Sequence, residues 1–366
     1  MRNNQITPQT KSLFDSIDNR SVLDRAGGGA THSFDSIISI QNLLLAWQEF
    51  IKDKKKKKDV QEFQLRLMEN IFSLHNDLKL NSYTHAHYDA FKINDPKPRD
   101  IHKAIVRDRL LHHAIYRILY PYFDKKFIYD SYSCRVSKGT HRAIERFTEF
   151  GRKVSKNNKK TCWVLKCDIR KFFASIDHDI LKGILAKHIE DKDTLLLIGN
   201  IIDSFETKNL KTDFTENSPW RTFSKGLPLG NLTSQLLVNV YMNEFDQFVK
   251  HTRRVKYYIR YADDFVFLSE DREYLENIKR EVAIFLRDIL RLELHPDKVY
   301  IKTLSSGVDF LGWVNFPHHR VLRTATKKRM FRNLKKSEYK EESVNSYLGM
   351  LSHGNAYKLQ KRITQI

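Results

Sequence analysis

The sequence has few cysteines and lacks the long apolar segments of membrane proteins. No apolar run approaches the roughly 20 residues that span a bilayer, and residues 1–19 are polar, without the apolar centre of a secretory signal. Three cysteines occur, and none has a partner at the usual metal-binding spacing: Cys134, Cys162 and Cys167. We therefore expect a soluble, cytoplasmic protein with no zinc site and no membrane partner.

Acidic residues are scarce relative to basic ones. The chain has 64 lysines and arginines against 44 aspartates and glutamates, a formal net charge of +20. Such an excess favours an anionic polymer as partner, because phosphate contacts release counterions. A basic protein with a solvated charged surface is the alternative. The five consecutive lysines at Lys54–Lys58 could likewise form either a solvated loop or a contact with phosphate groups.

The hydrophobic fraction of 41% suffices for a core, and 366 residues suit a large domain or two to three packed subdomains. Residues 1–35, rich in Asn, Ser, Thr and Gly, are predicted to form a flexible extension. Apolar residues at helical spacing predict helices over 102–122 and 272–290 and a mostly helical basic tail from Thr324. Apolar and aromatic runs predict strands at His87–Ile93, 161–168, 256–260, 265–269, 298–302 and 308–314.

Three aspartates stand at the ends of predicted strands. Asp168 ends a buried run, while Asp263 and Asp264 lie in the turn between two short hydrophobic strands. A lysine or arginine partner could explain Asp168 alone, and a solvated hairpin tip could explain the adjacent pair alone. Adjacent carboxylates repel each other, however, which favours a cation. Together the three could hold two Mg²⁺ ions, with Mn²⁺ as a possible substitute, about 3.5–4 Å apart, as nucleotidyl transfer requires.

Several motifs in order resemble the palm of reverse transcriptases: Asp168-Ile-Arg-Lys-Phe-Phe173, Leu227-Pro-Leu-Gly-Asn-Leu-Thr-Ser-Gln235 and Tyr261-Ala-Asp-Asp264. The resemblance extends over about residues 95–313. It implies an α+β right-hand polymerase fold with three parts. These are N-terminal helices and fingers at 36–160, a palm of antiparallel sheet backed by helices at 161–316, and a short helical basic thumb at 317–366.

The same resemblance implies an RNA-directed DNA polymerase and assigns its site residues. Asp168, Ile169, Asp263 and Asp264 would form the metal site. The nucleotide-binding residues would be Lys97, Arg99, Phe173, Leu229, Gly230, Gln235 and Lys298. Phe173 would act as the steric gate against a ribose 2′-hydroxyl, whereas Phe172 would be an ordinary core residue. The primer grip would comprise Phe310, Leu311 and Gly312. The implied partners are template RNA, the cDNA product and deoxynucleotides.

Arg135 and the basic segment 327–336 can each be interpreted in two ways. Arg135 could either structure its own loop or contact phosphate. The basic segment 327–336 is predicted to be a thumb helix that faces the template–primer backbone, although each of its residues could equally be solvated.

Leu229 and the Ser234-Gln235 pair depart from the common family pattern, in which Gln and a serine followed by proline occupy these places. They resemble reverse transcriptases of diversity-generating retroelements, which implies error-prone cDNA synthesis and a small basic accessory protein. An antiphage-defence enzyme that copies an associated structured noncoding RNA stays open. A non-catalytic nucleic-acid-binding scaffold is the alternative of another class, with stacking surfaces at Tyr257, Tyr258 and Tyr261.

Overall fold

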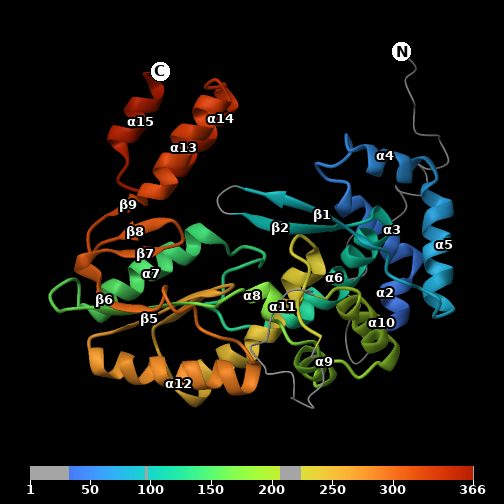
Figure 1. The fold of residues 1–366 in the computed structure, drawn as a ribbon, viewed down its shortest axis with the longest axis horizontal. Helices are drawn as coiled ribbons and strands as arrows, with labels where there is room; N and C mark the ends of the chain where they lie inside the picture. Colours follow the sequence, from blue (N-terminus) through green and yellow to red (C-terminus); the bar gives the residue numbers. More distant parts are fainter. Residues whose placement is uncertain (1–32, 95–97, 207–223, 366) are drawn as a thin grey trace, which may run out of the picture.

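The chain folds into an open hand, with N-terminal helices and a hairpin on one side, a sheet in the middle and C-terminal helices rising on the other (Figure 1). The computed structural model describes residues 33–94, 98–206 and 224–365. Most of the expected extension at 1–35, and Lys97, lie outside the described residues. The boundary at 35 is wrong, because Phe34 and Asp35 already belong to the first described helix.

The fingers consist of N-terminal helices packed around a long helix, together with a two-stranded hairpin. The helices are α2 (Phe34–Ile38), α3 (Ile40–Phe50), α4 (Lys58–Leu65), α5 (Leu67–Lys79) and α6 (Val106–Lys126). The hairpin pairs β1 (Tyr88–Ile93) antiparallel with β2 (Arg99–Ala104). The strand predicted near His87–Ile93 is confirmed, but the helix predicted from His102 begins only at Val106. Cross-strand pairing of residues 99–104 with β1 prevails there over the helical spacing of the apolar residues.

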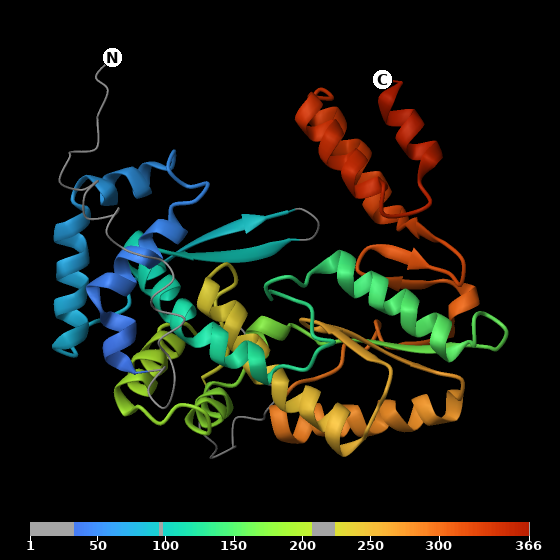
Figure 2. The ribbon, with the colours of Figure 1, turned by 180° about the vertical axis from the view of Figure 1, so that it is seen from behind.

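The palm is an antiparallel sheet covered by a helix on each face. Its strands follow the order β4 (Tyr258–Tyr261), β5 (Asp264–Ser269), β3 (Trp163–Asp168) and β6 (Tyr300–Thr303). Figures 1 and 2 show α7 (Thr140–Val154) over one face and α12 (Arg272–Leu290) under the other. The bounds predicted for α12 are confirmed, because the apolar residues along one face of the helix keep helical spacing and are buried: Leu275, Ile278, Val282, Leu286 and Leu290.

Further helices connect the palm to the fingers: α8 (Phe172–Ser175), α9 (His178–Ala186), α10 (Lys192–Asp203) and α11 (Leu232–Gln247). The helix predicted to start near Asp177 is α9, and the Asp177 side chain caps it by accepting from the N–H groups of Asp179 and Ile180. The predicted N-cap of α7 is wrong by one residue, since Gly139 takes that position and Thr140 begins the helix. After α11 the chain continues as the π-helical turn η1 (Phe248–Thr252).

The C-terminal part carries a small antiparallel sheet and the thumb helices. The strand predicted over 308–314 is two strands, β7 (Val308–Phe310) and β8 (Trp313–Asn315), preceded by the turn η2 (Leu304–Ser306). Leu311 and Gly312 turn the chain between them with φ of 53° and 88°. β9 (Arg320–Leu322) pairs with β8, so this sheet continues past the expected palm boundary at 316. The helical tail is confirmed as α13 (Thr324–Lys336), α14 (Glu341–Leu351) and α15 (Tyr357–Thr364).

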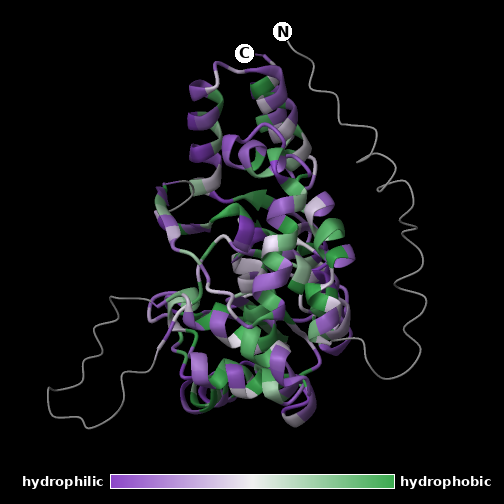
Figure 3. Cartoon of the chain, turned by 90° about the vertical axis from the view of Figure 1, so that its right-hand side faces the viewer, coloured by the Kyte–Doolittle hydropathy of each residue, from purple (hydrophilic) through white to green (hydrophobic). Residues whose placement is uncertain are grey.

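Two hydrophobic clusters hold these parts together. One joins the N-terminal helices to α11, α12 and one face of the palm sheet, and the other joins α7, the opposite face, β7, β8 and the thumb. Hydrophobic residues gather in the middle of the molecule, and hydrophilic ones prevail on the C-terminal helices (Figure 3). Cys162 and Cys167 are buried in the cores, as expected. Within the described ranges no helix combines the length and apolar character needed to cross a bilayer.

Candidate active site

A large cavity opens between the hairpin, the palm and the thumb, with a volume of about 2550 Å³. Residues from all three parts line it, including most of those singled out from the sequence: Arg99, Asp168, Ile169, Phe173, Leu229, Gly230, Gln235, Asp263, Asp264, Lys298, Leu311 and Gly312. Phe310 does not line it, because its side chain is fully buried against Phe147. The expected primer grip therefore reaches the cavity only through its turn residues.

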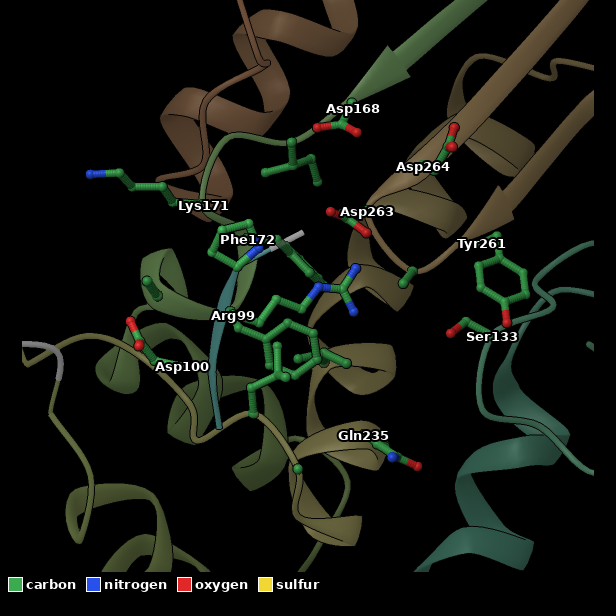
Figure 4. A pocket seen from close by; sticks show the side chains of 18 of the residues that line it. Arg99, Asp100, Ser133, Asp168, Lys171, Phe172, Gln235, Tyr261, Asp263 and Asp264 are labelled. Carbon is green, nitrogen blue, oxygen red and sulfur yellow. The ribbon is translucent and has the colours of Figure 1, made fainter. Parts of the chain in front are cut away.

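Strand pairing brings the three aspartates to one place in the fold. Asp168 ends β3 directly opposite Asp264, the first residue of β5. Directly opposed side chains leave the same face of a sheet, with Cβ atoms about 4.5–5.5 Å apart. Asp263 belongs to the preceding turn, which Ala262 makes with φ of 55°. The Ile169 N–H donates to the Asp263 carbonyl oxygen at 3.2 Å, and Figure 4 shows the three carboxyl groups around one space.

Two lysines partly compensate the negative charge of this group. Lys298 Nζ donates to Asp168 Oδ1 at 2.8 Å, and Lys166 Nζ lies 3.4 Å from Asp264 Oδ2. Burial raises the pKa of Asp264 to about 7, although Lys166 opposes the rise. Burial, followed by the charge of Asp168, also raises the pKa of Asp263. The site therefore has more buried carboxylate than its own cations can compensate.

The donor set suits a hard divalent cation. All candidate ligands are oxygens, and Asp264 Oδ1 is buried without a hydrogen-bond partner among the described residues. The side chains are not drawn together into a closed cage, since no three His, Cys, Asp or Glu residues of the described ranges lie close enough to hold a metal ion. Instead, Asp168 is bonded to Lys298, and Asp264 lies beside Lys166.

The loop at 227–231 fastens the fingers hairpin to the palm beside these aspartates. The His102 N–H donates to the Leu229 carbonyl oxygen at 3.1 Å, and Asn231 Nδ2 donates to the His102 carbonyl oxygen at 3.1 Å. Gly230 has φ of +117°, and a Cβ there would lie 3.0 Å from Ile101 Cγ2. Glycine is thus required by both the backbone conformation and the close approach of β2.

The two phenylalanines after Asp168 differ in burial, although both line the cavity. Phe172 is buried in the core as expected, the ring of Phe173 is half-buried, and the two ring centroids lie 5.6 Å apart. Arg99, on β2, extends toward the aspartates from the opposite side (Figure 4). A substrate in this space would meet a positive charge and an aromatic surface together.

The structure decides between the alternatives that the sequence left for Arg135 and Tyr258. Arg135 donates to Asp124 and to the carbonyl oxygens of Ile128 and Ser131, so it structures its own loop. Tyr258 is fully buried and cannot stack on a base, contrary to the stacking surface suggested from the sequence.

Among the remaining aromatic and basic candidates, Tyr261 lines the cavity but Tyr257 does not. Three basic residues of the thumb helix α13 line it as well: Lys328, Arg329 and Arg332.

Sequence reasoning missed two charged residues inside the palm sheet. Arg260 is fully buried, where its guanidinium donates to both carboxylate oxygens of Asp246 and, at 3.2 Å, to the Ala262 carbonyl oxygen of the aspartate turn. Lys166 is buried beside Asp264. The available signal was a basic residue within an otherwise apolar strand, which indicates a buried partner.

The family model described as "Reverse transcriptase (RNA-dependent DNA polymerase)" matches residues 93–314. The chain therefore belongs to the reverse transcriptase family, and its α+β architecture is the right-hand polymerase fold. Domains of this family generally depend on divalent metal ions.

Named relatives place the chain near bacterial and intron-encoded members of this family. Protein YkfC of Escherichia coli (strain K12) is 26% identical over 254 residues, which cover 60% of this chain and 61% of that protein. Group II intron-encoded protein LtrA of Lactococcus lactis is 25% identical over 301 residues, 65% of this chain and 47% of that protein. The chain thus spans about half to three-fifths of these relatives.

Solved telomerase structures match part of the chain at low identity. The apo telomerase from Candida tropicalis truncated from its C-terminal domain matches with a TM-score of 0.47 and 13% identity, over 70% of this chain and 60% of that one.

Proposed function

We propose that this protein is an RNA-directed DNA polymerase that adds deoxynucleotides to a primer on an RNA template. The observation that carries the proposal is the placement of Asp168 and Asp264 directly opposite each other, with Asp263 beside them, in a cavity lined by fingers, palm and thumb. Membership of the reverse transcriptase family supports it. The net charge of +20 suits a nucleic-acid partner.

Asp168, Asp263, Asp264 and Ile169 would hold two Mg²⁺ ions, with Mn²⁺ as a substitute. Bound there, the ions supply the positive charge that aligns a primer 3′-hydroxyl with the α-phosphate and stabilises departing pyrophosphate. Lys298 holds Asp168 in place by its hydrogen bond. Arg99 would orient the triphosphate, because a guanidinium can form paired hydrogen bonds with phosphate oxygens.

Other residues that line the cavity would select the sugar and place the strands. The half-buried ring of Phe173 would collide with a 2′-hydroxyl and so favour deoxynucleotides. Leu229, Gly230 and Gln235 would border the nucleotide, and the turn at Leu311–Gly312 would support the primer end. The thumb helix α13 would follow the template–primer backbone through the basic residues that line the cavity: Lys328, Arg329 and Arg332.

The decisive test is primer extension on an RNA template with Mg²⁺, comparing the parental protein with Asp263→Ala. We expect extension to fall by at least about a thousandfold while template–primer binding is retained, because a metal ligand acts on the chemical step. Asp288→Ala is the control, since Asp288 is exposed on α12 and pairs with its neighbour Arg287. Binding without extension by the parental protein would favour the non-catalytic scaffold.

We further propose that the enzyme makes error-prone cDNA within a diversity-generating retroelement and works with a small basic accessory protein. The support is Leu229 with Ser234-Gln235, and Leu229 presents an apolar side chain to the cavity. Sequencing the RNA that copurifies with the protein tests this role. A template repeat would support it, whereas a structured noncoding RNA from a defence locus would replace it with the antiphage role.

A further inference from the structure

The loop between α3 and α4, residues 51–57, concentrates positive charge beside the fingers hairpin. Residues 52–58 include six lysines and one aspartate. Five of the lysine side chains are exposed: Lys52, Lys55, Lys56, Lys57 and Lys58. In the described part of the chain only Lys58 among them has an acidic partner, Glu62 at 3.8 Å, and both of these side chains are largely exposed. The remaining charge is available to an external anion.

The sixth lysine fixes the shape of this lysine loop. Lys54 Nζ donates to the Phe50 carbonyl oxygen at 2.9 Å and lies 4.9 Å from the centre of the Phe50 ring. Backbone hydrogen bonds from Lys54 to Ile51 and from Lys57 to Lys54, at 3.0 and 2.9 Å, close the turns. An ordered loop loses less conformational entropy when it binds than a flexible lysine tail does.

The acidic residue that follows the run is already paired and ties the loop to the hairpin. Asp59 accepts from Lys103 on β2 at 2.6 Å and from Arg109 on α6 at 2.5 Å. Asp59 therefore holds the end of the loop at the base of β2. Figures 1 and 2 both show the loop above the hairpin base, on the side where the thumb helices rise.

The hairpin connects this position to the cavity. Residues along its two strands line the cavity: Tyr88, Ala90, Phe91, Arg99, Asp100 and His102. Figure 1 shows the hairpin and the thumb helix α13 on different sides of the palm, and the basic residues of α13 line the same cavity as the hairpin. A primer–template duplex held on the thumb side would leave the hairpin side to template that is not yet copied.

We propose that the lysine loop binds the phosphate backbone of the unpaired RNA template before that strand enters the cavity. This inference rests on the proposed polymerase function. Lysine ammonium groups suit a moving template, because they act as point charges on phosphates and read no base sequence. The loop would raise affinity for template ahead of the aspartates without contributing to the chemical step.

The test compares the parental protein with the triple variant Lys55→Gln, Lys56→Gln and Lys57→Gln on two ligands. Both ligands contain the same primer–template duplex; one has a single unpaired 5′ template nucleotide and the other roughly a dozen. We expect the variant to bind the long overhang about tenfold more weakly, and the slope of log K against log salt to shrink by about 2. Binding of the short overhang is expected to stay unchanged.

A charge-matched control removes three exposed basic residues from the far end of α7 and the loop after it: Arg152→Gln, Lys156→Gln and Lys159→Gln. It is expected to bind both ligands like the parental protein. Equal losses on both ligands, or no loss on the long overhang, would overturn the proposal. Extension from the short overhang checks the polymerase separately: if the parental protein cannot extend it, the proposed function fails whatever the lysine loop does.

Discussion

Leu229 contributes to the molecule in two ways at the scale of a single residue. Its carbonyl oxygen accepts from the His102 N–H, and its side chain lines the cavity. The first contact uses only backbone atoms, so any side chain at this position can preserve it. The side chain, in contrast, decides whether a polar or an apolar group borders the nucleotide.

Leu229→Gln is expected to lower misincorporation opposite template adenines by about fivefold while primer extension continues. The reason is that an amide could hydrogen-bond near the nucleotide, and one such bond is worth about 1 kcal/mol. Sequencing of cDNA made by each protein measures the error rate. Leu229→Met is the control and should keep the parental error rate. An unchanged error rate opposite adenines in Leu229→Gln would show that Leu229 does not determine fidelity.

Arg260 and Asp246 form a fully buried ion pair behind the aspartate turn. Arg260→Met is expected to destabilise the protein by about 3–5 kcal/mol, because it leaves the Asp246 carboxylate buried without its charge partner. Adding Asp246→Leu should recover most of that loss. Urea unfolding of both variants measures the difference, and a cost below about 1 kcal/mol for the single variant would contradict the assigned role.

At the scale of elements, the thumb depends on a close contact with the small C-terminal sheet. The Asn355 N–H, between α14 and α15, donates to the Arg320 carbonyl oxygen on β9 at 2.8 Å. The His353 ring stacks on His141 of α7 with 3.7 Å between centroids. Gly354 lies directly against the Trp313 ring of β8. These contacts fix where the basic face of α13 stands relative to the aspartates.

Gly354→Ala is therefore expected to destabilise the protein by about 1–3 kcal/mol, because the added Cβ would lie 2.0 Å from Trp313 Cζ3. Gly349→Ala is the matched control within α14, since apart from its chain neighbours and the backbone of its own helix no atom of the described residues lies within 4 Å of its added Cβ. That change should be neutral or stabilising by up to about 1 kcal/mol. Thermal unfolding of the two variants distinguishes them, and equal stabilities would count against a tight thumb contact.

At the scale of the whole molecule, the buried His112 and the half-buried His113 make folding stability depend on pH. Burial lowers the pKa of His112 to about 3 and that of His113 to about 4. The unfolded chain therefore binds more protons below pH 6.5, and the stability contributed by the neutral imidazoles is fully present above that pH. The charged and titratable groups around His112 are His85, Asp108, Arg109 and His113.

We expect the free energy of unfolding to fall by about 2 kcal/mol for His112 alone between pH 7 and pH 5. Denaturant unfolding at both pH values measures this change. His112→Gln should reduce the pH dependence, because a glutamine amide does not titrate in this range. Thr148 is half-buried on α7, away from these histidines. Thr148→Gln should therefore leave the pH dependence of the free energy of unfolding as it is in the parental protein.

Local sequence patterns correctly predicted those helix bounds that depend on residues only a few positions away. The bounds of α12 follow from its own helical periodicity, and the start of α9 follows from the Asp177 cap. Residues 102–104 were assigned to a helix and residues 308–314 to a single strand, both incorrectly, because pairing with other strands and the turn at Leu311–Gly312 determine their structure. Those interactions are not encoded in the periodicity of either segment.

The sequence by itself determined the family, the order of the three aspartates along the chain and the excess of positive charge, because each is written in residue identity and local spacing. Only the tertiary structure decided that Lys298 and Lys166 meet two of those aspartates, that Phe310 is a core residue, and that a run of lysines stands beside the fingers hairpin. Such contacts join segments far apart in the chain, so they depend on how strands pair and helices pack.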